Sequence, residues 1–146
     1  MRMITRILPV LMFLVFAAGC SGKGGAGESK EKWPAKPADG APLVVEFVKL
    51  VGADKDMQAE LKLFNFEAKA VRRLFMTTHF LDASGKELKD FPWSVQAPEV
   101  VGAKKTAVIK AGAFLPKETV SVKVTLREVE FTDGSKWEAE NAAPPK

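Results

Sequence analysis

The sequence predicts an all-β domain over residues 43–140, built as a sandwich of two antiparallel sheets with about seven strands in total. The clearest sign is the run from Val120 to Leu126, where apolar and polar side chains alternate as they do in a half-buried strand. Gly, Asp and Pro residues divide the range into short apolar runs, a pattern typical of strands joined by tight turns. No helical period competes with it. We therefore expect the core to lie between two sheets.

The first two strands are expected at Leu43 to Leu50 and at Ala59 to Phe66, around a turn at residues 52–56. In the second strand, the two-residue period places Leu61 and Leu63 on the inner face. The same period turns two aromatic side chains outward, those of Phe64 and Phe66.

A hairpin is expected next. Its first strand carries Leu74, Met76 and Phe80 on one face and ends in the turn Asp82-Ala-Ser-Gly-Lys86. A three-residue loop at positions 83–85 gives two cross-strand pairs, Phe80 with Leu88 inside and Leu81 with Glu87 outside. Further aromatic groups are expected in connecting segments, at Phe91-Pro92-Trp93 and Phe114-Leu115-Pro116.

The last strands follow a strand expected at Lys104 to Lys110, which Gly112 and Pro116 end. After Leu126 the apolar positions shift by one residue, so a β-bulge near Arg127-Glu128 is needed to keep apolar side chains on the core face. A three-residue type I loop then turns the chain, with Gly134 left-handed. It predicts three cross-strand pairs: Val129–Trp137, Glu130–Lys136 and Glu128–Glu138.

The beginning of the chain has the pattern of an export signal. Arg2 and Arg6 precede Ile7–Ala18, a run without charged or polar side chains. A run of about 12 residues is too short for a hydrocarbon layer that needs about 20. The run Phe16-Ala-Ala-Gly-Cys20 that ends it resembles a bacterial lipobox. The resemblance implies a signal peptide at residues 1–19 and lipidation of Cys20, and Ser21 favours sorting to the outer membrane.

Residues 20–42 are expected to be the lipidated cysteine and a flexible tether rich in Gly, Lys, Ala and Pro, with Trp33 as its lone aromatic residue. Residues 141–146 are expected to be a disordered tail. The whole chain has 22 Lys and Arg against 18 Asp and Glu, but residues 43–140 hold fifteen of each sign. A domain without net charge does not attract a phosphate backbone electrostatically, so no nucleic-acid partner is expected.

Seven short strands in about 100 residues favour an immunoglobulin-like or fibronectin type III-like sandwich. Asn65 after Leu61 and Leu63, followed by Phe80-Leu-Asp-Ala-Ser-Gly-Lys86, resembles the small FxLYD-type and related immunoglobulin-like domains of bacterial lipoproteins. The resemblance covers residues 59–137. It implies a binding or scaffold role outside the cytoplasm and no shared catalytic residues. With the lipobox and Ser21, the expected location is the outer membrane, on its periplasmic side or at the cell surface.

No catalytic residue is predicted. His79 is the single histidine, it lies in mid-strand, and no Gly-x-Ser-x-Gly motif accompanies it. Glu128, Glu130 and Glu138 suggest an acid–base pair or a Ca²⁺ site, but a salt-bridged sheet edge that includes Lys136 is favoured. We therefore expect no enzyme, no metal and no cofactor. An envelope hydrolase or a metal-binding accessory protein is the alternative.

The candidate partner-binding residues are Phe75, His79 and Leu81, which the strand period turns away from the core. Two interpretations stay open for the outward apolar side chains: neighbouring segments bury them, or they form a surface that recruits an envelope protein, peptide or glycan. The second interpretation assigns the chain to the non-catalytic binding or scaffold modules. The membrane is a further expected partner, through the lipid on Cys20.

Overall fold

The computed structural model describes residues 31–112 and 115–140. The predicted signal peptide, Cys20 and the tail at 141–146 lie outside the described residues, as does Phe114. Within these two ranges the regular structure is strand, apart from one 3₁₀ turn, η1, at Asp54–Asp56. They contain no helix that is long and apolar enough to cross a membrane.

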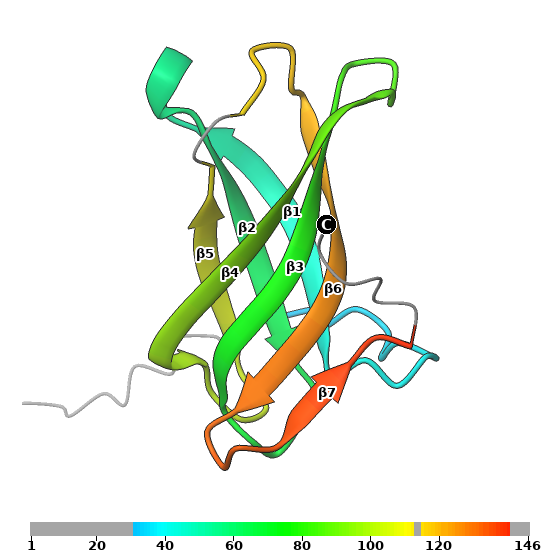
Figure 1. The fold of residues 1–146 in the computed structure, drawn as a ribbon, viewed down its shortest axis with the longest axis vertical. Coiled ribbons are helices and arrows are strands. Elements are labelled where there is room, and N and C mark those ends of the chain that lie inside the picture. Colours follow the sequence, from blue (N-terminus) through cyan, green and yellow to red (C-terminus); the bar gives the residue numbers. More distant parts are fainter. Residues whose placement is uncertain (1–30, 113–114, 141–146) are drawn as a thin grey trace, which may run out of the picture. The chain divides into compact units, whose positions relative to one another are not determined.

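In residues 31–112 and 115–140, seven strands form two antiparallel sheets (Figure 1). The first has three strands in the order β1-β2-β5, namely β1 Leu43–Val51, β2 Gln58–Asn65 and β5 Thr106–Ala111. The second has the order β4-β3-β6-β7, with β3 Val71–Leu81, β4 Glu87–Val101, β6 Ser121–Phe131 and β7 Lys136–Glu138. The prediction of an all-β fold with two antiparallel sheets is confirmed.

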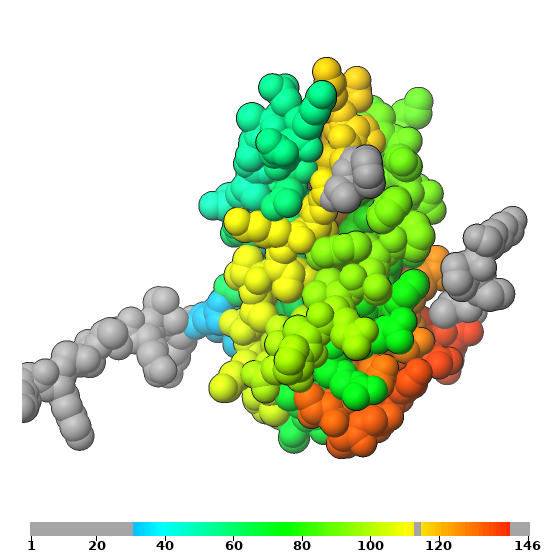
Figure 2. Space-filling view, turned by 60° about the vertical axis from the view of Figure 1, so that its left-hand side comes forward, coloured from blue at the N-terminus to red at the C-terminus, as the bar shows by residue number. Residues whose placement is uncertain are grey.

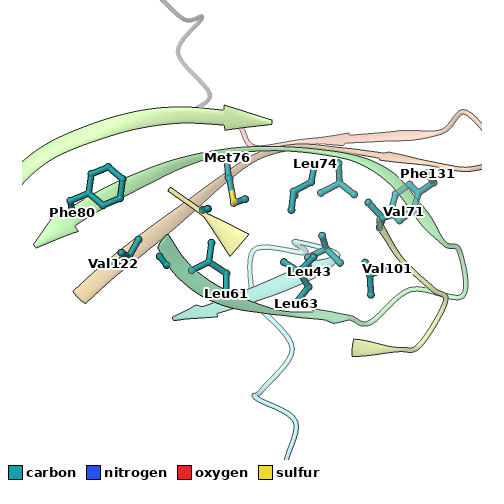
Figure 3. Close-up of a cluster of buried hydrophobic side chains, with 13 residues drawn as sticks. Leu43, Leu61, Leu63, Val71, Leu74, Met76, Phe80, Val101, Val122 and Phe131 are labelled. Atoms are coloured by element: carbon teal, nitrogen blue, oxygen red, sulfur yellow. The ribbon is translucent and has the colours of Figure 1, made fainter. Parts of the chain in front are cut away.

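The core lies between the two sheets, as Figure 3 shows. Leu61 and Leu63 reach it from β2, and Leu74 and Met76 reach it from β3; all four are fully buried. These side chains are two residues apart because successive side chains of a strand alternate between its faces. The predicted inner faces of both strands are therefore confirmed.

The predicted bulge in β6 is present. Met76 pairs with Leu126, whereas the preceding residue, Phe75, pairs with Glu128. Arg127 is thus the extra residue, and its insertion returns Val129 to the core side with no exposed surface.

The turn between β6 and β7 also matches its prediction. The register pairs Val129 with Trp137, and Gly134 has a left-handed φ of 84°. Asp133 Oδ1 accepts hydrogen bonds from the backbone N–H of Ser135 at 2.9 Å and from its hydroxyl at 2.5 Å. Together with a contact to Lys69, these bonds hold the pKa of Asp133 far below its ordinary value.

The hairpin between β3 and β4 differs from its prediction by one residue. Leu81 pairs with Glu87 as expected, but Phe80 pairs with Lys89 and not with Leu88. The register shifts at this point, so Leu88 is the extra residue of a bulge and is 36% exposed. The predicted inner pair with Leu88 is therefore wrong, because a loop length alone does not reveal a bulge beside the loop.

The assignment of Phe91-Pro92-Trp93 to a connecting segment is also wrong. These residues belong to β4, which is 15 residues long and forms an edge of its sheet. Phe91 pairs with Thr78 and Trp93 with Met76, and both aromatic side chains pack half-buried against the core. In the sequence, Pro92 and Pro98 interrupt the pattern of a strand. An edge strand nevertheless tolerates proline, because one of its sides has no pairing partner.

Residues 33–42 form a strap that lies with the β domain in one compact unit. The ring of Trp33 packs edge-on against Phe64, at 5.7 Å between centroids, and against Phe66, at 5.2 Å. Phe64 is therefore only 2% exposed although it points away from the core. Trp33, expected as a lone aromatic residue of the tether, is instead the cover of the two aromatic side chains that the sequence turns outward.

Candidate functional site on the four-stranded sheet

Phe75, His79 and Leu81 all lie on β3, a central strand of the four-stranded sheet. The residues between them on the opposite face, such as Met76 and Phe80, are buried in the core. The three candidate side chains therefore share the outer face of this sheet, and each is half-buried.

Phe75 lies between Ser94 of β4 and Glu128 of β6 in the register of the sheet. The guanidinium of Arg73, two residues away on the same face, lies 6.0 Å from the centroid of the Phe75 ring. This cation–π contact covers part of the ring. Phe75 thus presents a partly covered aromatic surface with polar neighbours on both sides.

His79 is held through both ring nitrogens. Nδ1 lies 3.1 Å from a carboxylate oxygen of Glu87, and Nε2 lies 3.0 Å from the hydroxyl of Thr125. The imidazole is 21% exposed. These contacts fix the orientation of the ring and leave neither nitrogen without a protein partner.

Arg127, the bulge residue of β6, lies across the face between Phe75 and His79. Its Nε donates a 3.1 Å hydrogen bond to the hydroxyl of Thr77, which is only 6% exposed. The three candidate residues are therefore brought onto one face but do not form one continuous apolar surface.

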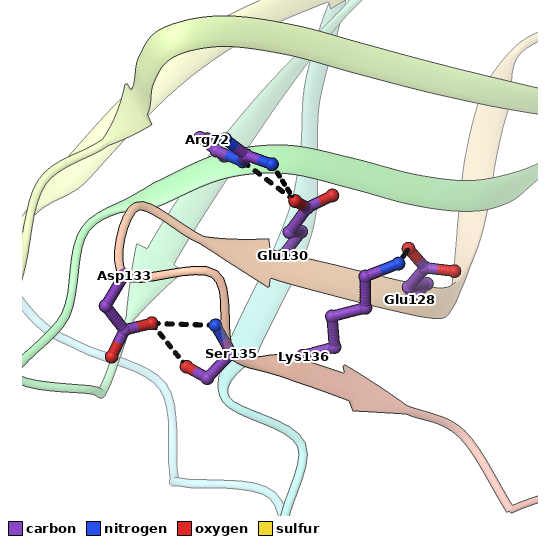
Figure 4. Close-up of polar contacts among 6 residues, drawn as sticks. All are labelled: Arg72, Glu128, Glu130, Asp133, Ser135 and Lys136. Carbon is purple, nitrogen blue, oxygen red and sulfur yellow. Dashed lines mark hydrogen bonds and ion pairs between the residues drawn. The ribbon is translucent and has the colours of Figure 1, made fainter.

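A row of charged side chains borders the site toward β7 (Figure 4). The Nε of Arg72 donates a 2.8 Å hydrogen bond to Glu130, and its Nη2 contacts the same carboxylate oxygen. Lys136, the cross-strand neighbour of Glu130, extends its ammonium to Glu128 at 3.4 Å. The expected salt-bridged edge is present, with Arg72 in place of Lys136 as the partner of Glu130.

Sequence reasoning missed Arg72 and Arg127 because both depend on bulges. The register of β3 shifts between Val71 and Arg73, so Arg72 falls outside the regular alternation of the strand. The predicted bulge in β6 located Arg127, but nothing in the pattern indicated that its side chain would cross to Thr77.

Replacing Glu130 with Gln is expected to lower the melting temperature at pH 7, with a deficit that shrinks as the pH falls. The hydrogen bond from Arg72 lowers the pKa of Glu130 from its ordinary value of 4.5. Ionised Glu130 therefore stabilises the fold fully at pH values above its ordinary pKa. This contribution is lost as the pH falls through the lowered pKa. Thermal unfolding of both proteins between pH 7 and pH 2 measures the deficit.

The control is Glu118→Gln, an exposed carboxylate whose removal should leave the melting temperature unchanged across the series. A deficit of Glu130→Gln that stays constant down to pH 2 would contradict the assigned role of the Arg72 contact.

A solvent-open depression of about 580 Å³ lies beside the charged row. Arg72, Gln96 and Thr132 line it with polar groups, and Ala97 and Pro98 with apolar ones. None of Phe75, His79 and Leu81 lines it.

Over residues 31–112 and 115–140, no three His, Cys, Asp or Glu side chains gather closely enough to hold a metal ion. No protein-family model, curated protein or solved structure matches the chain.

Proposed function

We propose that this chain is a lipoprotein of the bacterial envelope, anchored through Cys20, whose β domain is a non-catalytic binding or scaffold module. The sequence Ala18-Gly19-Cys20 behind an apolar run supports the anchor. The observation that carries the binding role is the outer face of the four-stranded sheet. There the half-buried ring of Phe75 lies near the guanidinium of Arg73, on the face that also carries His79 and Leu81.

We also propose that the two sheets form an immunoglobulin-like sandwich. The order β1-β2-β5 with β4-β3-β6-β7 corresponds to strands A-B-E and C′-C-F-G of an immunoglobulin-like sandwich. This correspondence supports the resemblance to immunoglobulin-like lipoprotein domains.

Several titratable side chains make contacts within the sheet and its turns. His79 is bound at both nitrogens, and Glu130 is bound by Arg72. Asp82 Oδ1 accepts hydrogen bonds from the backbone N–H and hydroxyl of Ser84, and Asp133 does the same for Ser135. These groups hold the turns and the sheet together.

Photocrosslinking in intact cells tests the binding role. A benzoylphenylalanine at position 75 keeps an aromatic ring there and is expected to capture one recurrent partner. The matched control is the same group at Val108, which is 56% exposed on the outer face of the other sheet and should not capture that partner. Phe75→Ser should abolish binding of the partner while the near-UV circular dichroism stays native.

The anchor is tested in the same cells. Cys20→Ser should move the protein from the membrane fraction to the soluble fraction. Unchanged fractionation of Cys20→Ser would contradict the anchor, and identical crosslinks from positions 75 and 108 would contradict the assigned binding face.

A further inference from the structure

The strap fixes the place where the chain leaves the domain. The contacts that hold it include the two aromatic contacts of Trp33, a 3.2 Å ion pair between Lys36 and Glu67, and the hydrogen bond from the backbone N–H of Phe66 to the carbonyl of Pro42. A turn between Pro37 and Gly40, with Gly40 at a φ of 76°, reverses the strap between these contacts. The chain is therefore attached to the domain at Trp33, ten residues before β1 begins.

Trp33 lies on the outer face of the three-stranded sheet. Its partner Phe64 points away from the core, between Val44 of β1 and Thr106 of β5. In Figure 1 the strap passes behind this sheet, and in Figure 3 it leaves on the side opposite the core. Figure 2 shows the first strap residues (blue) at the margin of the domain, beside the yellow residues of the β4–β5 turn and β5. The exit point of the chain is thus on one face of the domain and not between the sheets.

The length of chain before Trp33 is short compared with the domain. Twelve residues separate Cys20 from Trp33, a distance of at most about 47 Å when fully extended. For a Gly-rich composition the average reach is about 20 Å, less than the width of roughly 34 Å of a sphere whose radius of gyration is about 13 Å. A lipid on Cys20 would therefore hold the exit face close to the bilayer surface.

The exit face carries a small excess of positive charge and an exposed apolar side chain. Its outward side chains include one lysine from each strand, namely Lys49, Lys62 and Lys110. They also include two glutamates, Glu46 and Glu60, so these side chains carry a net charge of +1. Val108, on the same face, is 56% exposed. Lysine and an exposed apolar side chain suit a surface of anionic headgroups above acyl chains.

We infer that the outer face of the β1-β2-β5 sheet lies against the anionic lipid surface of the membrane that holds Cys20, with the strap setting this orientation. The inference rests on the proposed anchor. It turns the outer face of the four-stranded sheet, with Phe75 and His79, away from the bilayer. A partner would then approach from the side opposite the membrane.

Fluorescence quenching in vesicles tests the orientation. The purified lipidated full chain is placed in phosphatidylethanolamine–phosphatidylglycerol vesicles with nitroxide-labelled headgroups. One fluorophore is attached through a cysteine that replaces either Val108 or Lys123. These two residues lie on the outer faces of the two different sheets. We expect at least threefold stronger quenching at position 108.

Trp33→Ala should lower the ratio of the two quenching values, because the contacts described above would then hold the chain to the domain only from Lys36 onward. Trp33→Phe, which keeps an aromatic contact with Phe64, should retain most of the ratio. Loss of hydrogen-exchange protection at the Phe66 amide, which is bonded to the carbonyl of Pro42, reports release of the strap independently of the membrane.

The outcomes separate the two proposals. Mass spectrometry of the N-terminal peptide shows whether Cys20 is acylated; an unacylated Cys20 overturns the anchor and the orientation together. An acylated chain with equal quenching at both positions, or with stronger quenching at 123, overturns the orientation alone. A ratio that Trp33→Ala leaves unchanged overturns the role of the strap.

Discussion

Replacing Asn65 with Asp is expected to destabilise the domain by about 3 to 5 kcal/mol. Asn65 is fully buried, and its Nδ2 donates to the carbonyls of Lys69 at 2.7 Å and Gly102 at 2.9 Å. Its Oδ1 accepts from the backbone N–H of Glu67 at 3.0 Å. Aspartate removes both donors and sets a buried carboxylate against two carbonyl oxygens.

Thermal unfolding measures this effect, and a loss of this size should lower the melting temperature by more than about 10 °C. Gln58→Glu is the matched control, because it makes the same amide-to-carboxylate change at the exposed opposite end of β2. Equal melting temperatures for the two variants would show that the hydrogen bonds of the Asn65 side chain do not stabilise the domain.

Replacing Val122 with Asp is expected to cost a similar amount, about 3 to 5 kcal/mol. Val122 is 6% exposed, belongs to the core cluster and pairs with Phe80 across the sheet. A carboxylate at this position has no cationic partner among the apolar side chains of the core. We expect loss of the cooperative unfolding transition at physiological temperature.

Lys123→Asp is the control for this variant, since Lys123 lies next in the chain but is exposed on the outer face opposite His79. It should cost less than about 1 kcal/mol. Urea denaturation of both variants compares the two faces directly. Equal tolerance of aspartate at 122 and 123 would contradict the inward direction of Val122.

The hairpin between β6 and β7 could be predicted because the residues that determine its register lie close together in the sequence. Val129 must return to the core after Leu126, which requires a bulge, and Gly134 allows the left-handed conformation that a three-residue loop needs. The burial of Leu61, Leu63 and Met76 followed from the strand period in the same way.

The remaining features depend on contacts between segments distant in the sequence. Trp33 covers Phe64 from 31 positions away, and Arg72 binds Glu130 from 58 positions away. No period or spacing encodes such contacts. The outward direction of Phe64 was predictable from its strand, but its burial was not, because the strap resembled a spacer in composition.

For the candidate site, the sequence placed Phe75, His79 and Leu81 on one face of β3, where the structure has them. It did not indicate that Arg127 would separate them, nor that Glu87 and Thr125 would hold His79. Both facts follow from the registers of β4 and β6, which include bulges that a single strand cannot reveal.

The prolines of β4 bear on how copies of this chain behave when they are crowded. A long edge strand normally offers a row of free N–H groups that the edge of another molecule can extend, which leads to aggregation. Pro92 and Pro98 lack this donor, and the exposed charges of Lys89, Asp90 and Glu99 lie near them on the same strand. Two domains that meet along β4 cannot complete a ladder of hydrogen bonds. Growth of cross-β assemblies through this edge is therefore disfavoured.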